Sequence, residues 1–104
     1  MSVYEHWVTG TIANGAATTG VINLGRESEW VEIVLPTLDS GTIKVQVCDT
    51  ATGTFVDLGA NITTATTTGG YADTWVIGGY QFIKIVSSAN QTAERTIKLR
   101  GFKM

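Results

Sequence analysis

The sequence is short of the side chains on which most catalytic, metal and disulfide chemistry depends. Its 104 residues include one cysteine, one histidine and one proline. A single cysteine, Cys48, excludes an intramolecular disulfide, and a catalytic triad with a histidine base would have to use His6. A zinc site needs several closely spaced Cys, His or carboxylate ligands, and the chain lacks that spacing. We therefore expect no cofactor, no metal and no enzymatic activity.

Charge and long apolar runs are also scarce. Seven Lys and Arg residues against nine Asp and Glu residues give a formal net charge of −2. Nucleic-acid binding depends on Lys and Arg that neutralise phosphates, so we expect no nucleic-acid partner. No stretch approaches the roughly 20 apolar residues of a membrane span, and the start MSVYEHWVTG does not resemble a signal peptide. We expect a protein made in a cytoplasm, with no membrane partner.

A sustained helical period of about 3.6 residues is missing as well, and period-two alternation takes its place. Ile43, Val45 and Val47, for example, alternate with Lys44 and Gln46. Such alternation is typical of half-buried strands, and the frequent Thr, Val and Ile side chains favour strands too. Strands are predicted at residues 8–12, 21–24, 30–35, 42–48, 54–58, 74–77, 80–87 and 97–100, with a Thr-rich edge strand or loop at 61–68. Turns are predicted at residues 14–15, 25–28, 38–41, 49–53 and 78–79.

About eight or nine short strands at this spacing predict an all-β fold. The expected architecture is a single antiparallel β-sandwich over residues 1–104, jelly-roll-like as first choice and immunoglobulin-like as second. Residues 1–7 are a candidate N-terminal arm. The apolar members of the best alternating strands should share one core, and these are Ile43, Val45, Val47, Ile83, Ile85, Ile97 and Leu99.

The carboxylates most simply serve turns. Asp39, Asp49, Asp57 and Asp73 are all expected at strand ends or in loops, where Asp side chains bond nearby backbone N–H groups. A glycosidase pair drawn from these residues, or a Ca²⁺ loop using Asp49, Thr52 and Asp57, are the less favoured alternatives.

Aromatic residues provide the remaining candidates for a binding site. Trp30 and Trp75 lie within predicted strands and are expected to pack in the core or on a sheet. Tyr4, His6 and Trp7 lie in the N-terminal segment, where apolar side chains outside regular strands usually need a partner surface. These three residues are the predicted partner interface, because Trp and Tyr are favoured at interfaces. Stacking of exposed rings on a sugar is the alternative.

Several strands, taken in order, carry a resemblance to a known group of proteins. They are Val31–Pro36, Ile43–Val47, Thr52–Leu58, Tyr80–Ile85 and Ala93–Leu99. Together they resemble the small β-sandwich structural proteins of tailed bacteriophages, which are capsid decoration and head- or tail-associated proteins. The resemblance spans roughly residues 30–103 and leaves the N-terminal segment uncovered.

This resemblance implies a non-enzymatic virion protein. The first expectation is a capsid decoration or cement protein, located in the virion and bound to the major capsid protein or another virion protein. It also implies a homo-oligomer, with a trimer as first choice. The alternative is a tail- or fibre-associated carbohydrate-binding module whose partner is a glycan.

Overall fold

A computed structural model describes residues 3–4, 6–38, 42–64 and 71–103, and these residues form seven strands. The side chains of residues 3–4, 59–64 and 71 lie outside this description. The strands are β1 (Val3–Tyr4), β2 (Val8–Ile12), β3 (Ile22–Leu35), β4 (Thr42–Cys48), β5 (Val56–Thr64), β6 (Tyr71–Ser87) and β7 (Arg95–Lys103). In the part of the chain described here, no helix is long and apolar enough to cross a membrane.

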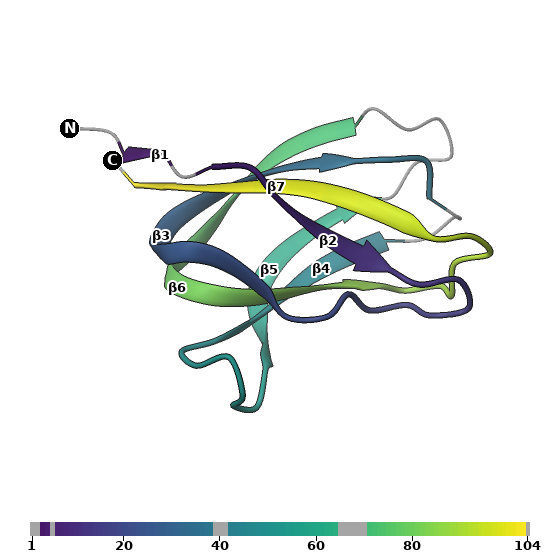
Figure 1. Ribbon diagram of the computed structural model, residues 1–104, viewed down its shortest axis with the longest axis horizontal. Coiled ribbons are helices and arrows are strands. Elements are labelled where there is room, and N and C mark those ends of the chain that lie inside the picture. The colour runs from purple at the N-terminus through teal and green to yellow at the C-terminus, as the bar shows by residue number, and fades with distance from the viewer. Residues whose placement is uncertain (1–2, 5, 39–41, 65–70, 104) are drawn as a thin grey trace.

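The strands form two layers because β3 and β6 are long and bend sharply (Figure 1). Hydrogen bonds connect them in the order β1-β7-β3-β6-β4-β5, with β2 also on β7, and every pairing is antiparallel. The second half of β3 lies between β7 and the first half of β6. The second half of β6 instead pairs with β4 and with the start of β3. We call β1, β2, β7, the second half of β3 and the first half of β6 the first layer, and β4, β5, the start of β3 and the second half of β6 the second layer. The predicted all-β, jelly-roll-like antiparallel sandwich is confirmed.

The bends of β3 and β6 replace two predicted turns. Residues 25–28 and Gly78-Gly79 were expected to end strands, yet both lie inside continuous strands. Gly25, Gly78 and Gly79 have positive φ angles of 93°, 73° and 101°, which other residues rarely adopt. β3 and β6 change direction at these glycines but remain paired with each other, so each strand passes from one layer into the other. These two bends join four of the predicted strands into two, and the seven strands of the described residues also reflect the merging of 54–58 with part of 61–68 into β5 and the addition of β1.

The core fills the space between the layers. All seven residues predicted to share it do so, and each is at most 1% exposed. Val31, Ile33 and Leu35 join them from β3, where alternate residues face inward. Trp75 is also in the core, whereas Trp30 packs on the outer face of the first layer.

Of the remaining turn and strand predictions, some are confirmed, one is wrong and some fall outside the described residues. The turn at Asn14-Gly15 and the end of β3 before Pro36 are as predicted. The two stretches expected at 54–58 and 61–68 instead form one strand, β5, as far as Thr64. Residues 65–68, and residues 39–41 of the turn predicted at 38–41, lie outside the described part of the chain.

Two of the four aspartates are placed differently from the prediction. Asp57 lies within β5 and Asp73 within β6, because both strands are longer than expected. Asp49 does follow the end of β4 as predicted. Asp39 lies outside the described residues.

Candidate functional site

The N-terminal segment runs along β7. Val3 pairs with Lys103 and Tyr4 with Phe102, and β2 pairs with β7 farther along the same edge. His6 and Trp7 lie between β1 and β2, and both are exposed. The Tyr4 side chain lies outside the described part of the structure.

Trp7 also belongs to the predicted interface. Two cations of β7, Lys98 and Arg100, lie over its ring. The ring centroid is 5.2 Å from Lys98 Nζ and 4.6 Å from Arg100 Cζ. Cations at this distance are attracted to the electron-rich face of an indole. Trp7 nevertheless remains 41% exposed, so a large aromatic ring is held in a defined place on the surface.

Aromatic and apolar groups continue from there across the outer face of the first layer. Phe102 pairs with Trp30, and Trp30 pairs with Val76 on the next strand. The Trp30 and Phe102 rings are stacked, with centroids 6.1 Å apart and an interplanar angle of 12°. Val76 is 52% exposed. We call Trp7, Trp30, Val76, Lys98, Arg100 and Phe102 the aromatic face.

An ion pair within this face orients Arg100. Its Nη2 donates to Glu32 Oε1 at 2.8 Å, and both side chains are about a third exposed (28% and 32%). Arg100 and Glu32 are directly opposite one another on β7 and β3. The Arg100 guanidinium beside Trp7 is therefore held by an ion pair to β3 as well as by its own position on β7.

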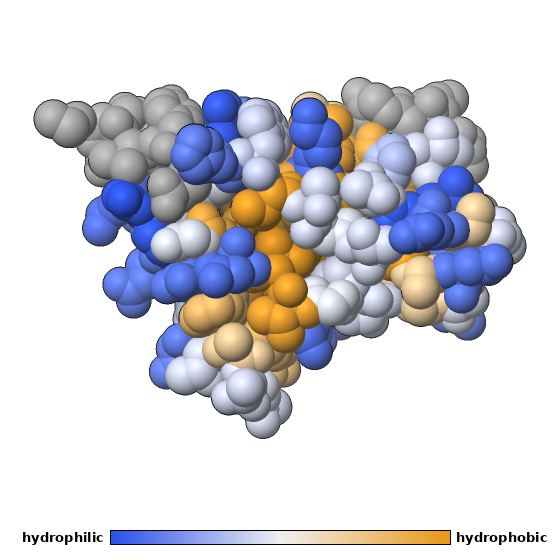
Figure 2. All heavy atoms as spheres, in the orientation of Figure 1, coloured by the Kyte–Doolittle hydropathy of each residue, from blue (hydrophilic) through white to orange (hydrophobic). Residues whose placement is uncertain are grey.

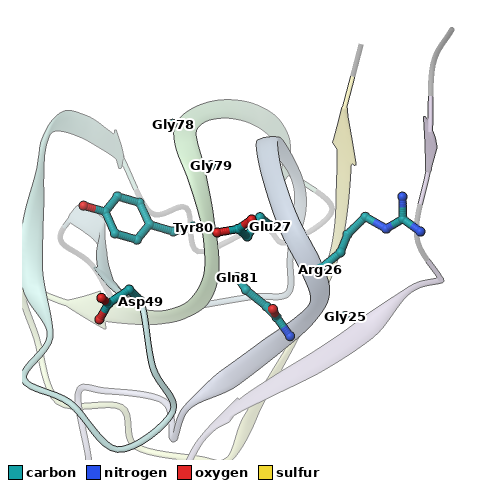
Figure 3. A pocket seen from close by; sticks show the side chains of 8 residues that line it. All are labelled: Gly25, Arg26, Glu27, Asp49, Gly78, Gly79, Tyr80 and Gln81. Carbon is teal, nitrogen blue, oxygen red and sulfur yellow. The ribbon is translucent and has the colours of Figure 1, made fainter.

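A cavity of about 490 Å³ lies at the corner where β3 and β6 bend (Figure 3). Glu27, Tyr80 and Gln81 line it from the two bends, and Asp49 contributes from the loop after β4. Arg26 also borders the cavity, but Figure 3 shows its side chain pointing away from the other labelled groups. The acidic residues among those that line the cavity are Glu27 and Asp49.

Two successive bulges create this cavity. Between the pairs Asn23–Phe82 and Ser28–Tyr80, residues 24–27 of β3 stand against Gln81 alone. Between the pairs Ser28–Tyr80 and Trp30–Val76, residues 77–79 of β6 stand against Glu29 alone. Extra residues on first one strand and then the other force the backbones apart. Such bulges bend strands and redirect side chains, often beside functional sites.

Asn23 secures one wall of the cavity. Its side-chain oxygen accepts hydrogen bonds from the Gly25 backbone N–H at 2.8 Å and from Gln81 Nε2 at 3.0 Å. One amide thus links the bend of β3 to β6. Tyr80 packs partly against the core, so its ring is supported on the protein side while it borders the cavity.

A smaller cavity, of about 290 Å³, adjoins the first one. Val47, Cys48, Thr54 and Val56 line it together with Asp49 and Tyr80, which also line the larger cavity. Cys48 is buried, and its Sγ lies 3.7 Å from Asp49 Oδ1. Tyr80 and Asp49 therefore border both hollows.

The outer face of the second layer contains a separate polar cluster. Lys44 Nζ and Gln46 Nε2 donate to the two carboxylate oxygens of Asp57, at 2.9 and 3.0 Å. These hydrogen bonds, that of Lys44 first, hold the pKa of the Asp57 carboxyl below its usual 3.8. Nearby, Lys84 Nζ lies 4.8 Å from the ring centroid of Phe55.

Groups suited to metal binding do not gather in the described part of the chain, where no three His, Cys, Asp or Glu residues come together. Asp49, Asp57 and Asp73 belong to different elements. Asp57 is engaged by Lys44 and Gln46, and Asp73 accepts a hydrogen bond from the Thr74 backbone N–H. The absence of enzymatic activity stays a prediction.

No model of a known protein family matches the chain, and no curated protein matches its sequence. Solved structures do share its fold. The SPBc2 prophage-derived protein YomS superposes with a TM-score of 0.58 at 14% identity, covering 96% of this chain and 95% of that chain. The family 32 carbohydrate-binding module of Clostridium perfringens NanJ, solved with galactose, gives a TM-score of 0.57 at 11% identity, covering 92% and 93%.

A third similar structure is the F5/8 type C domain of a Bacteroides fragilis protein. Its TM-score is 0.55 at 8% identity, and it covers 94% of this chain and 93% of that chain. Identities this low establish the β-sandwich fold and leave the function open, since one fold serves many functions.

The interface at Tyr4, His6 and Trp7 stays a prediction, whereas the corner cavity has no counterpart in the sequence analysis. The sequence predicts a turn at Gly78-Gly79, which would place Tyr80 at the start of a new strand. The signal that could have found the cavity is the pair of glycine sites, Gly25 and Gly78-Gly79, on two strands that pair with each other.

Proposed function

We propose that this chain is a non-enzymatic structural protein of a bacteriophage particle, a capsid decoration protein that attaches through its aromatic face. The observation that carries the proposal is Trp7, a large exposed ring held in place by Lys98 and Arg100. Trp and Arg dominate the binding energy of many protein interfaces, because they bury large areas and make directed contacts. The fold shared with a prophage-derived protein over nearly its whole length supports the proposal.

The composition of the aromatic face suits a protein partner. Trp30, Phe102 and Val76 supply apolar area, while Lys98 and the Arg100–Glu32 pair supply charged groups beside it, farther along β7 and β3. Protein interfaces likewise combine apolar area with polar and charged groups. Figure 2 shows that hydrophobic side chains also reach the surface in a strip through the middle of the face drawn there, between hydrophilic groups.

We further propose that the protein acts as a homo-oligomer, with a trimer as first choice. A 104-residue domain buries a modest core, and contacts between subunits would remove more apolar surface from water at about 25 cal/mol per Å². Closed cyclic symmetry is the common arrangement of such assemblies. The trimer itself follows from the resemblance to phage structural proteins.

The test is binding to particles that lack the protein. Trp7→Ala should weaken binding at least tenfold, measured by co-sedimentation, while circular dichroism remains that of a folded β protein. Phe55→Ala is the matched control, because it removes another ring from beneath a lysine, on the second layer. Equal binding by the Trp7 and Phe55 variants, or absence of the intact chain from purified particles, would refute the proposal.

A second candidate function is glycan binding, and the corner cavity favours it. A ring beside carboxylate and amide groups in a half-open hollow is suited to a sugar. Two proteins of similar fold are a carbohydrate-binding module solved with galactose and a chitosan-binding module from Paenibacillus, the latter with a TM-score of 0.52 at 14% identity over 90% of this chain and 76% of that chain. Binding of a glycan without binding to particles would favour this function over the first.

A further inference from the structure

We infer that the corner cavity is a binding site for non-acidic saccharides and that Tyr80, Asp49, Glu27 and Gln81 form it. The inference rests on the second candidate function, to which it assigns a place and a ligand class. It does not depend on the aromatic face.

The size and shape of the cavity come first. Its volume of about 490 Å³ falls within the range of about 300–1,000 Å³ found for small-molecule sites. The smaller hollow shares Asp49 and Tyr80 with it. A ligand of more than one sugar ring could therefore extend from one hollow into the other along Tyr80.

The chemistry of the walls selects the ligand. Tyr80 offers an aromatic surface and a hydroxyl, and its packing against the core keeps it in place. The carboxylates of Asp49 and Glu27 accept hydrogen bonds and donate none, whereas the Gln81 amide can do both. A ligand that matches them must present several hydroxyl or amino donors around a compact apolar body, and a sugar ring does so.

Charge excludes one class of sugar. Two acidic residues, Glu27 and Asp49, line the cavity, and the side chain of the one arginine on its border points away from the other labelled groups (Figure 3). A uronic acid or another anionic sugar would be repelled, since like charges brought together out of water destabilise one another. An amino group on the sugar would be attracted for the same reason. We expect affinity to fall from amino sugar to neutral sugar to acidic sugar.

The double bulge gives the site its rigidity. The Asn23 side-chain oxygen accepts from both Gly25 and Gln81, so two hydrogen bonds restrain the bend of β3 against β6. Gly78 and Gly79 have nothing within 4 Å of where a Cβ would be, so their backbone is open to a ligand. A preformed site loses little conformational entropy on binding.

The experiment uses the full chain and three hexoses of one ring size, which are glucosamine, galactose and galacturonic acid, each also as short oligomers. Two-dimensional NMR titration should shift the backbone resonances of Gly78, Gly79 and Tyr80 with glucosamine and galactose oligomers. Galacturonic acid oligomers should bind at least tenfold more weakly. Absence of these shifts with all three sugars, or tightest binding of the acidic one, would overturn the inference.

Substitutions then locate the site. Asp49→Asn and Glu27→Gln should each weaken binding of glucosamine oligomers at least fivefold and narrow the discrimination against galacturonic acid. Glu94→Gln is the control, because it removes the same charge from an exposed residue that lines neither hollow. An equal loss of affinity in Glu94→Gln would mean that the overall charge of the protein attracts the sugar. That result would overturn the assignment of the cavity as the binding site. The two proposals can fail separately, because Trp7→Ala tests particle binding and leaves this cavity unchanged.

Discussion

The indole of Trp7 lies against the guanidinium of Arg100, with the Arg100 Cζ 4.6 Å from the ring centroid. Arg100 is in turn bonded to Glu32 on the neighbouring strand. A residue of the N-terminal segment is thereby connected through β7 to β3, across the outer face of the first layer. The segment that was predicted to need a partner surface rests partly on the protein's own surface and leaves one large ring available to another molecule.

The Trp7–Arg100 contact should be measurable as a coupling free energy. In a double-mutant cycle of Trp7→Leu and Arg100→Met, followed by guanidinium denaturation, we expect a coupling of about 0.5–1 kcal/mol, as for other exposed cation–aromatic pairs. The cycle cancels the separate effect of leaving Glu32 without its cation. Strictly additive effects of the two substitutions would show that the contact contributes nothing.

The assignment of inner and outer faces can be tested with two valines. Val45 is fully buried between the layers, so Val45→Ala should destabilise the fold by about 1–3 kcal/mol through lost burial and a cavity. Val76→Ala makes the same change at a residue that is 52% exposed, and it should alter stability by less than about 0.5 kcal/mol. The reverse order of denaturation midpoints would contradict the arrangement of the layers.

Much of this fold could be predicted because its main signals are local. Alternation along residues 42–48 identifies both the strand and its buried face, and Pro36 marks where its predecessor ends. The bends could not be predicted in the same way. Gly78-Gly79 has the local chemistry of a turn, and whether the chain reverses or only bends depends on whether β3 continues to pair with it. That pairing joins residues far apart in the sequence.

The two candidate sites also differ in whether a local signal in the sequence predicts them. Trp7 was identified because an aromatic residue outside the regular strands is unusual in the sequence itself. Asp49 is one of the aspartates considered above for turns, a glycosidase pair or a Ca²⁺ loop, whereas Glu27 and Tyr80 lie in stretches of ordinary composition. The pairing of β3 with β6 and the loop after β4 bring the three residues to one cavity, and strand register is a property that no single strand reveals.

The corner should be sensitive to side chains at its glycines. Gly79→Ala should destabilise the protein by about 1 kcal/mol or more, because alanine resists the φ of 101° found there. There is open space around the missing Cβ, so the cost comes from the backbone and not from a clash. Gly20→Ala is the control, since Gly20 also has open space but no positive φ. If Gly79→Ala and Gly20→Ala lowered the thermal midpoint equally, the result would argue against backbone strain at the bend.

The last prediction concerns acid and the Asp57 cluster. Hydrogen bonds from Lys44 and then Gln46 lower the pKa of Asp57 in the folded protein, so the charged carboxylate is favoured by folding. For a lowered pKa the stabilisation is present above the unfolded pKa, here the usual 3.8, and is lost as the pH falls through the lower folded value. The free energy of unfolding of the native chain should therefore exceed that of Asp57→Asn by a steady amount near neutral pH. This difference should shrink as the pH falls below the unfolded pKa of 3.8. Because the pair is exposed, added salt should reduce the advantage as well. Urea denaturation across this pH range at low and high salt measures both effects, and an advantage that grew on acidification would reverse the assigned direction of the pKa.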